Sequence, residues 1–510
     1  MKVEGVEMEK KVTGLVVLIA AAALPLVAEM EPSTPEAEGI SSAAIGAWID
    51  ACERELDAMH GFVIVRHGKI VAEGWWRPFS ADRTHMLYSH SKSFTSTAVG
   101  FLADDRKLDL DERVLDIFPD KAPSTPSTNV EFLRVRDLLT MTTGMPYTDA
   151  ERKNIGGDWV KLFLANEAKD LPGTVYRYDS CATHVLAAIV ERKSGMKLMD
   201  FLKARLFDEI GIERAWTTTS PQGVACGGWG MNMTTRELAR FGQLYLQEGR
   251  WGGKQILSRN WVRLATAYQT STQRSGDGDW NQGYGFQFWR CRHNCYRADG
   301  AQGQFTVVMP DQDAVVSLHA GLGPMEKELD LVWKYLLPAM QAKSLPPDAA
   351  AQTALKDRCA KLALRTVKGE RTGMGALGRT FGLSGEQKRF RFTSARLDPK
   401  ESGWVIVLGS PGGDVRIPVG FGAWHEGMAR FENEEYEKLG GLVGVQPTAA
   451  SGAWTAPNVF RARVYLHNTT FRLDLVFTFQ EDGTLSLALD LFGMGGGKWS
   501  LKGGCVDGER

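Results

Sequence analysis

The chain has 510 residues, which is too long for one ordinary domain and predicts two to four. Hydrophobic residues make up 43% and charged residues 24%, close to the averages of soluble globular proteins, so wholesale disorder is excluded. Its 60 basic and 61 acidic residues give a net charge of −1, without a long block of one sign. A nucleic-acid partner is therefore not expected.

The N-terminal segment is apolar. Residues 12–28 carry no charge, follow Lys10-Lys11 and end in the small-residue sequence Leu26-Val27-Ala28. This pattern is typical of a secretory signal peptide, which we predict over residues 1–28. The alternative is an uncleaved membrane anchor, because the run is at the short limit for a spanning helix. Both interpretations place the body outside the cytoplasm, as a periplasmic or secreted protein, with a membrane tether only if the segment stays uncleaved.

The predicted elements then follow in chain order. A Pro/Glu-rich linker (29–39) precedes a helix from about Ser41 to Met59 and a β-hairpin from Gly61 to Trp76. The chain is mostly helical from Thr95 to Gly249. Strand-like runs return in the sequences GYGFQFWRC, QFTVVMP and AVVSLHA, and a last helix is expected over 327–341.

Strands at both ends of this region flank a helical middle. The economical packing is one antiparallel sheet covered by helices, an α+β domain that we place at 40–342 with a mostly helical subdomain. A linker with one helix follows (343–370). Residues 371–510 alternate apolar and polar side chains between Gly- and Asp-bearing turns, which predicts an antiparallel β-domain, either a barrel or a sandwich.

Seven cysteines fit neither a disulfide-rich scaffold nor repeated zinc-binding pairs. Cys291 and Cys295 are the one pair close in sequence, and a tight hairpin would let their side chains face each other. In an exported protein such a pair can be oxidised. A metal site with His293 would have only two thiols and one imidazole. We therefore expect a disulfide or free thiols, and no metal.

The segment Leu87–Gly100 contains a Ser-x-x-Lys pair. Ser89 lies at the predicted start of a helix and Lys92 one turn later on the same face. The helix N-terminus favours developing negative charge, and a partly desolvated lysine can act as a base or stabilise an alkoxide. The pair alone is weak evidence, because serine is also a common helix N-cap.

Two further segments carry polar groups that fit the same chemistry. Tyr178 and Ser180 precede a predicted helix, and a tyrosine close to a lysine can have a lowered pKa and relay a proton. The alternative for Tyr178 is a core side chain with a satisfied hydroxyl. Gly300 and Gly303 allow a strand edge to approach a substrate closely, although they also fit a bulged strand.

The order and spacing of these three segments resemble the serine hydrolases of the β-lactamase-like family. This family includes class C β-lactamases, D-alanyl-D-alanine carboxypeptidases, β-lactamase-type esterases and 6-aminohexanoate-dimer hydrolases. The resemblance covers about residues 39–340 and includes the connecting sequences RDLLTMTTGM and GGWGMNMTTRELARFGQLYLQEGRWGGKQIL.

The resemblance implies a role for each residue. Ser89 would be the acylated nucleophile, Lys92 would take or stabilise its proton, and Tyr178 would be the shared acid and base. Ser180 stands where the family often has Asn. Backbone N–H groups at Ser89 and near Ala301 would form the oxyanion hole. The implied mechanism has two steps, an acyl-enzyme and its hydrolysis, and needs no cofactor.

One departure from the family pattern concerns the substrate. Where β-lactamases commonly have Lys-Thr/Ser-Gly, this chain has Ala298-Asp299-Gly300. On charge alone, an acidic Asp299 should disfavour carboxylate-bearing β-lactams and favour neutral or cationic esters and amides. His90 is expected to point outward or to form a wall. Four tryptophans are candidates for an apolar pocket: Trp75, Trp76, Trp159 and Trp229.

Three functions remain open at this stage. The first is an exported serine hydrolase for a small-molecule ester or amide. The second is a D-amino-acid peptidase or weak β-lactamase acting on peptidoglycan-like substrates. The third is a non-catalytic binding or sensing protein of the same fold. Retention of Ser89, Lys92 and Tyr178 together argues against the third.

Overall fold

The computed structural model describes residues 30–146, 156–272, 275–375, 377–387, 390–431, 444–494 and 496–506. The predicted signal peptide therefore lies outside the described residues. Within these ranges, none of the helices combines the length and apolar character that crossing a membrane requires.

Six strands form the central sheet of the first domain, in the order β2-β1-β11-β10-β9-β8, and every neighbouring pair is antiparallel. The predicted early hairpin and late strands thus form one sheet, as expected. The strands are β1 (Met59–Arg66), β2 (Lys69–Trp75), β8 (Trp289–Arg290), β9 (Tyr296–Gly300), β10 (Gln304–Met309) and β11 (Ala314–Ala320).

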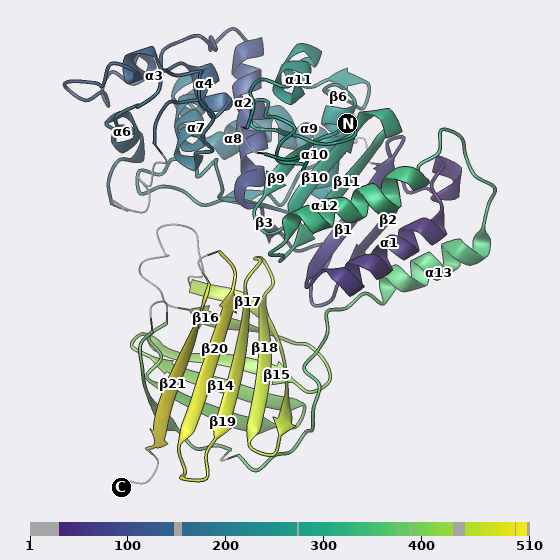
Figure 1. The fold of residues 1–510 in the computed structure, drawn as a ribbon, viewed down its shortest axis with the longest axis vertical. Helices are drawn as coiled ribbons and strands as arrows, with labels where there is room; N and C mark the ends of the chain where they lie inside the picture. The colour runs from purple at the N-terminus through teal and green to yellow at the C-terminus, as the bar shows by residue number, and fades with distance from the viewer. Residues whose placement is uncertain are drawn as a thin grey trace, which may run out of the picture.

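The two faces of this sheet pack against different helices, because successive side chains on a strand point to opposite sides. Phe62 and Ile64 of β1 pack with α1 (Ser42–Glu55) and α12 (Met325–Leu331) in one core. Val63 and Val65 belong to the other core, with α10 (Thr235–Leu246) and the helical subdomain. Figure 1 shows α1 and α12 on one side of the sheet.

Two predicted helices have different bounds in the structure. The helix expected up to Met59 ends at Glu55, because Leu56 is extended (φ −116°, ψ 146°) and leads into β1. The last helix of the domain begins at Met325 as α12. It continues as a π-helical turn over Val332–Leu336 and a 3-10 turn over Leu337–Ala339.

The middle of the domain is mostly helical, as predicted. Helix α2 runs through this subdomain and is buried from Ser91 to Leu102, so its neighbours surround it. The elements are α2 (Ser91–Asp104), α3 (Val114–Ile117), α4 (Val135–Leu139), α6 (Trp159–Leu164), α7 (Ser180–Ser194), α8 (Leu198–Leu202), α9 (Asp208–Ile210) and α11 (Arg259–Thr266), with short strands β3 (His85–Met86), β4 (Trp216–Thr217), β5 (Met231–Met233), β6 (Arg250–Trp251) and β7 (Lys254–Gln255).

The C-terminal domain is a β-barrel, which decides between the two predicted alternatives. After α13 (Ala349–Ala360), its strands follow the order β15-β14-β13-β12-β21-β20-β19-β18-β17-β16, and a parallel contact of Gly420 with Ser451 joins β15 to β17. They are β12 (Phe381–Ser384), β13 (Ser394–Lys400), β14 (Gly403–Ser410), β15 (Gly413–Gly420), β16 (His425–Phe431), β17 (Gly444–Ala456), β18 (Val459–Leu466), β19 (Arg472–Phe479), β20 (Leu485–Phe492) and β21 (Gly497–Cys505).

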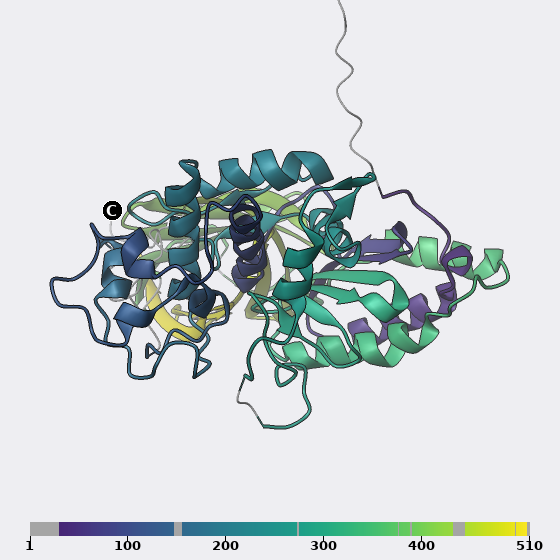
Figure 2. The same cartoon turned by 90° about the horizontal axis from the view of Figure 1, so that it is seen from above.

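The barrel lies directly against the first domain (Figures 1 and 2). Arg83 forms an ion pair with Glu426 of β16 at 2.6 Å, and the Met86 N–H donates to the carbonyl of Asn468 at 2.8 Å. Asn468 belongs to the turn between β18 and β19. This turn therefore contacts the chain just before the predicted nucleophile.

Candidate active site

Ser89 lies in a 3-10 turn, η2 (Tyr88–His90), that leads directly into α2. The sequence placed Ser89 at the helix start, but α2 begins at Ser91, so its first turn contains Lys92 instead. Tyr88 has φ 47°, a left-handed conformation that is costly for a residue with a side chain. Ser89 is half-buried at this bend.

Lys92 is buried, with 1% of its surface exposed, and its Nζ lies within hydrogen-bond distance of acceptors from three segments. Its Nζ donates to Ser89 Oγ at 3.0 Å, to Ser180 Oγ at 3.0 Å and to the carbonyl of Gly228 at 2.6 Å. Three acceptors match the three donors of an ammonium group. The geometry therefore brings together Ser89, Lys92 and Ser180, as the sequence predicted, and adds Gly228.

Helix α7 positions the second pair of predicted residues. It begins at Ser180, and the Asp179 carboxylate caps it by accepting from the N–H of Cys181 at 2.9 Å. Tyr178 comes just before this cap. Its ring centroid lies 4.8 Å from Lys92 Nζ, and its hydroxyl forms a hydrogen bond with Ser89. Ser89 Oγ is thus flanked by Lys92 and Tyr178.

The surroundings of Tyr178 favour its neutral form. Burial raises its pKa well above the ordinary value for a phenol, although the hydrogen bond with Ser89 acts in the opposite direction. The surrounding aromatic rings belong to Trp289, stacked at 5.7 Å, and Tyr284, at 6.2 Å. The expectation that a nearby lysine lowers the pKa of Tyr178 is therefore wrong, because desolvation dominates.

The end of β9 meets the turn that carries Ser89. A Cβ atom on Gly300 would lie 2.0 Å from the carbonyl oxygen of Leu87 and 3.2 Å from the His90 nitrogen, so only glycine fits. Ala301 follows in the turn to β10. Gln304 fixes this turn, because its Nε2 donates to the carbonyls of Ala301 at 3.3 Å and Gln302 at 3.2 Å. The predicted strand edge is therefore adjacent to Ser89.

Asp299 is not a free acidic group facing a substrate. Only 8% of it is exposed, and its Oδ2 accepts from Nε of the fully buried Arg297 at 2.8 Å. Arg297 in turn lies over the ring of Trp280 at 4.4 Å. The pair has no net charge, so the argument that Asp299 repels carboxylates by charge alone is wrong.

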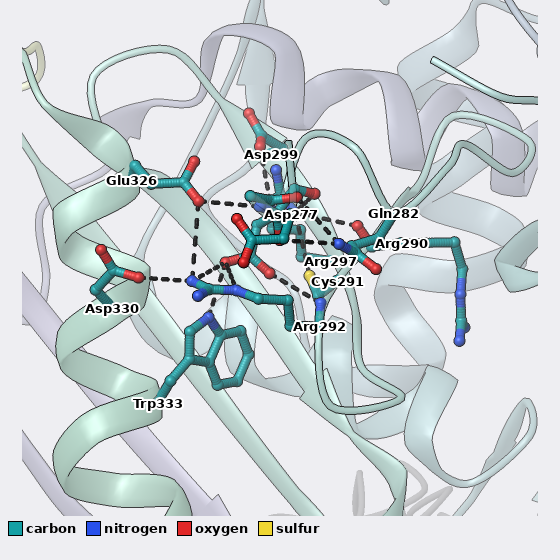
Figure 3. A network of polar contacts seen from close by, with 12 residues as sticks. Asp277, Gln282, Arg290, Cys291, Arg292, Arg297, Asp299, Glu326, Asp330 and Trp333 are labelled. Atoms are coloured by element: carbon teal, nitrogen blue, oxygen red, sulfur yellow. Dashed lines mark hydrogen bonds and ion pairs between the residues drawn. The ribbon is translucent and has the colours of Figure 1, made fainter. Parts of the chain in front are cut away.

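The Asp299–Arg297 pair belongs to a larger network (Figure 3). Arg297 donates to the carbonyl of Asp279 at 3.2 Å, and the Asp279 carboxylate pairs with Arg292 at 2.8 Å. Arg292 also pairs with Asp330 of α12 at 2.6 Å. Burial opposes ionisation of Asp279, but hydrogen bonds led by that from Arg292 lower its pKa below the ordinary value. The network ties β9 to α12.

His90 and the tryptophans differ from some expectations. His90 is fully buried with Nε2 2.9 Å from Thr306 Oγ1, and burial lowers its pKa to about 3, so it forms a wall and does not point outward. Trp159 and Trp229 lie 5.9 Å apart, and Trp229 follows Gly228. The indole N–H of Trp75 instead donates to Thr235, and that of Trp76 donates to Glu53. The four do not line one pocket.

Cys291 and Cys295 close a tight hairpin through a backbone bond of 2.9 Å, but both thiols are free. Cys291 Sγ accepts from Arg297 at 3.1 Å. In the part of the chain that the structure describes, no three His, Cys, Asp or Glu side chains are arranged to hold a metal ion.

Several residues around the site were not found from the sequence. One is Gly228 of the GGWG sequence, whose carbonyl accepts from Lys92, because a backbone acceptor leaves no mark in the sequence. Gln302 and Thr470 form a hydrogen-bonded group with Tyr88. Thr470 is separated from Tyr88 by 382 residues, and no local pattern marks such a contact.

Known proteins resemble this chain in both sequence and structure. It is 28% identical over 262 residues to a 6-aminohexanoate-dimer hydrolase of Paenarthrobacter ureafaciens, covering 47% of this chain and 66% of that protein. It is 27% identical over 172 residues to a D-aminopeptidase of Brucella anthropi, covering 30% of this chain and 31% of that protein. The matches thus span just under two thirds of the first relative and about a third of the second.

A solved structure assigned as a 6-aminohexanoate-dimer hydrolase from Bacillus anthracis superposes with a TM-score of 0.52 at 19% identity. It covers 63% of this chain and 89% of that one, which supports the fold alone. The family model described as Beta-lactamase matches residues 49–339, more than half of the chain. The chain therefore belongs to the β-lactamase family, with a C-terminal β-barrel beside the family domain.

Proposed function

We propose that this protein is a serine hydrolase that cleaves an ester or amide through an acyl-enzyme on Ser89. The observation that carries the proposal is the position of Ser89 Oγ, which accepts from the buried Lys92 Nζ at 3.0 Å and is hydrogen-bonded to Tyr178. The hydrolases among its relatives support the same reaction class.

In acylation, Ser89 Oγ attacks the carbonyl carbon while its proton moves to the Tyr178 oxygen. Tyr178 passes its own proton to the leaving oxygen or nitrogen as that bond breaks, so the tyrosine remains neutral throughout. This relay agrees with the raised pKa of Tyr178, since no free phenolate is required. Lys92 stabilises the negative charge that develops on Ser89 Oγ.

Hydrolysis of the acyl-enzyme reverses the relay. Water gives its proton to Tyr178 and attacks the ester carbon, and Ser89 recovers a proton as it leaves. We assign the oxyanion hole to the backbone N–H groups of Ser89 and Ala301. The close approach of Gly300 to the Ser89 turn supports this assignment.

The lining of the site favours an acyl substrate without a strong charge requirement. Asp299 is neutralised by Arg297, and the aromatic side chains near Tyr178 include Trp289. We therefore propose a small ester or amide whose acyl group needs no charge, and the earlier reason for preferring a cationic substrate no longer applies. A second candidate, a D-amino-acid peptidase or weak β-lactamase, is favoured by the D-aminopeptidase relative and by the absence of an uncompensated charge at Asp299.

The proposal is tested with the full-length protein and three substrates: p-nitrophenyl butyrate, D-alanine p-nitroanilide and benzylpenicillin. We expect ester hydrolysis that disappears in Ser89→Ala. Faster turnover of the D-alanine substrate or of penicillin would favour the second candidate. Absence of hydrolysis with all three would contradict the enzyme and favour a binding or sensing protein.

Export is also proposed, since the predicted signal peptide precedes the domain in the sequence. Expression in a Gram-negative host followed by cell fractionation tests this point. A shortened chain in the periplasm or medium is expected, whereas a full-length chain in the cytoplasm would contradict export.

A further inference from the structure

The turn that carries Ser89 depends on an unfavourable backbone conformation. Tyr88 has φ 47°, and such a conformation persists only where surrounding contacts hold it. The Tyr88 side chain is buried, with 8% exposed. The contacts of its hydroxyl therefore bear directly on the position of Ser89.

The shorter of those contacts comes from the other domain. Tyr88 Oη lies 2.9 Å from Thr470 Oγ1 in the turn between β18 and β19 of the barrel. Thr470 also donates to Gln302 Oε1, and Tyr88 Oη approaches the same oxygen at 3.4 Å. Gln302 belongs to the turn that follows Gly300. The threonine hydroxyl thus links both backbone segments on which the proposed oxyanion hole depends.

A second bond fixes the same segment from the same side. The N–H of Met86 donates to the carbonyl of Asn468 at 2.8 Å. Thr470 has 1% of its surface exposed, so its hydroxyl has no ready exchange with water. Backbone and side-chain bonds from one barrel turn therefore hold the chain at Met86 and at Tyr88, on both sides of Leu87.

We propose that the barrel turn Leu466–Phe471 is a working part of the catalytic site, with Thr470 as a positioning residue for Ser89 and for the oxyanion turn. The inference rests on the proposed function. The C-terminal domain would then take part in acylation through this one turn, although its core is apolar. Loss of the Thr470 hydroxyl should leave the barrel folded and let Tyr88 relax toward an ordinary conformation, which displaces Ser89.

The test compares Thr470→Val, Thr470→Ser and Tyr88→Phe in the full-length protein. Thr470→Val retains the shape and removes the hydroxyl, and we expect the rate constant of acylation by p-nitrophenyl butyrate to fall about tenfold. Thr470→Ser should stay within about twofold of the wild type. Since Thr470→Val and Tyr88→Phe both remove the Tyr88–Thr470 hydrogen bond, the loss in the double variant should be smaller than the sum of the two single losses.

Glu426→Gln is the matched control, because it weakens another contact between the domains, the solvent-exposed ion pair with Arg83, and leaves the bonds to Met86 and Tyr88 in place. We expect it to acylate at the wild-type rate. Wild-type acylation by Thr470→Val, or an equal loss in Glu426→Gln, would overturn the proposal. A loss that only follows a fall in Tm would overturn it as well.

Amide hydrogen exchange gives a readout that does not require activity. Thr470→Val should increase exchange in a peptide covering residues 86–92, whereas Glu426→Gln should not. Unchanged exchange in Thr470→Val would overturn the positioning role. If the wild type forms no acyl adduct but Thr470→Val increases exchange, the proposed function fails and the structural link to the barrel stands.

Discussion

The two domains differ in the polar groups that they bury. In the first domain the buried groups include charged side chains such as Lys92, Arg297 and Asp299. In the described part of the barrel no Asp, Glu, Lys or Arg is buried. Its few buried polar side chains are Thr448, Ser451, His467, Thr469 and Thr470, and the last three lie in the turn that contacts the first domain.

This difference indicates that the first domain carries the reacting groups and that the barrel interior mainly stabilises the fold. Burial of a charge or an unpaired polar group is costly unless specific partners compensate it, so such groups persist where they serve a purpose. The barrel core instead follows from alternation, with Leu473, Leu475 and Phe477 of β19 buried and their neighbours half-buried. The barrel therefore has an ordinary apolar interior and one polar end, which faces the site.

The largest effect is expected for Lys92→Met. The substitution keeps the length of the side chain but removes the cation beside Ser89 Oγ, so ester hydrolysis should fall by about 10³-fold or more. Lys203→Met, at an exposed ion pair, should leave the rate unchanged. The rate of ester hydrolysis is measured by steady-state kinetics on folded protein. A Lys92→Met rate within tenfold of the wild-type rate would contradict the role of the ammonium.

Tyr178→Phe should be the next largest, because it removes the proton relay and keeps the ring among Trp289 and Tyr284. We expect kcat to fall by about 10²- to 10⁴-fold, the usual range for general acid–base groups. The effect should be greatest for substrates with poor leaving groups, since these depend most on protonation. Equal losses for an activated ester and an anilide would argue against the relay. Tyr268→Phe, at a side chain 60% exposed, serves as the control.

Leu475→Ala tests the other side of the comparison. Leu475 is fully buried in the barrel core, so its truncation should cost about 2–5 kcal/mol of unfolding free energy of that domain. The rate per folded molecule should change little, because the side chain does not contact the site. Urea unfolding and kinetics on the same samples separate the two effects. A large loss of kcat without a loss of stability would show that the barrel core has a role beyond support.

The smallest effect concerns pH. His85 is buried beside His60, at 2.9 Å, and burial lowers its pKa from 6.5 to about 4. The unfolded chain binds a proton below about pH 6.5 that the folded chain accepts only near pH 4. The contribution of neutral His85 to the free energy of unfolding is therefore complete above pH 6.5 and is lost as the pH falls toward 4. Urea unfolding between pH 8 and 4.5 should show this decline, with a shallower slope for His85→Gln. Identical slopes would refute the assignment.

Much of the fold was predictable because it follows from local patterns. Alternation predicted the hairpin of β1 and β2 and the β-rich C-terminal domain, and the sequence also predicted α7 and the mostly helical middle of the first domain. The ends of helices were less predictable, since Leu56 is extended to feed β1. The choice between barrel and sandwich required strand order, which local pattern does not contain.

The site was predictable where its residues lie in short motifs. Ser89, Lys92, Tyr178 and Ser180 come together as expected. The pKa of Tyr178 was not predictable, because it depends on burial among rings from distant segments. Arg297 stands two residues before Asp299 on one face of β9, so the sequence alone already contains the spacing that pairs them. Thr470 was not visible, since only the tertiary fold brings it to Tyr88.

The central claim, an acyl-enzyme on Ser89, is tested most directly by intact-mass analysis. Full-length protein is mixed with p-nitrophenyl butyrate, quenched in acid within the first turnovers and digested to locate the modification. One butyryl group on the peptide that contains Ser89 is predicted, with none in Ser89→Ala. Hydrolysis that continues in Ser89→Ala, or a butyryl group on another residue, would contradict it.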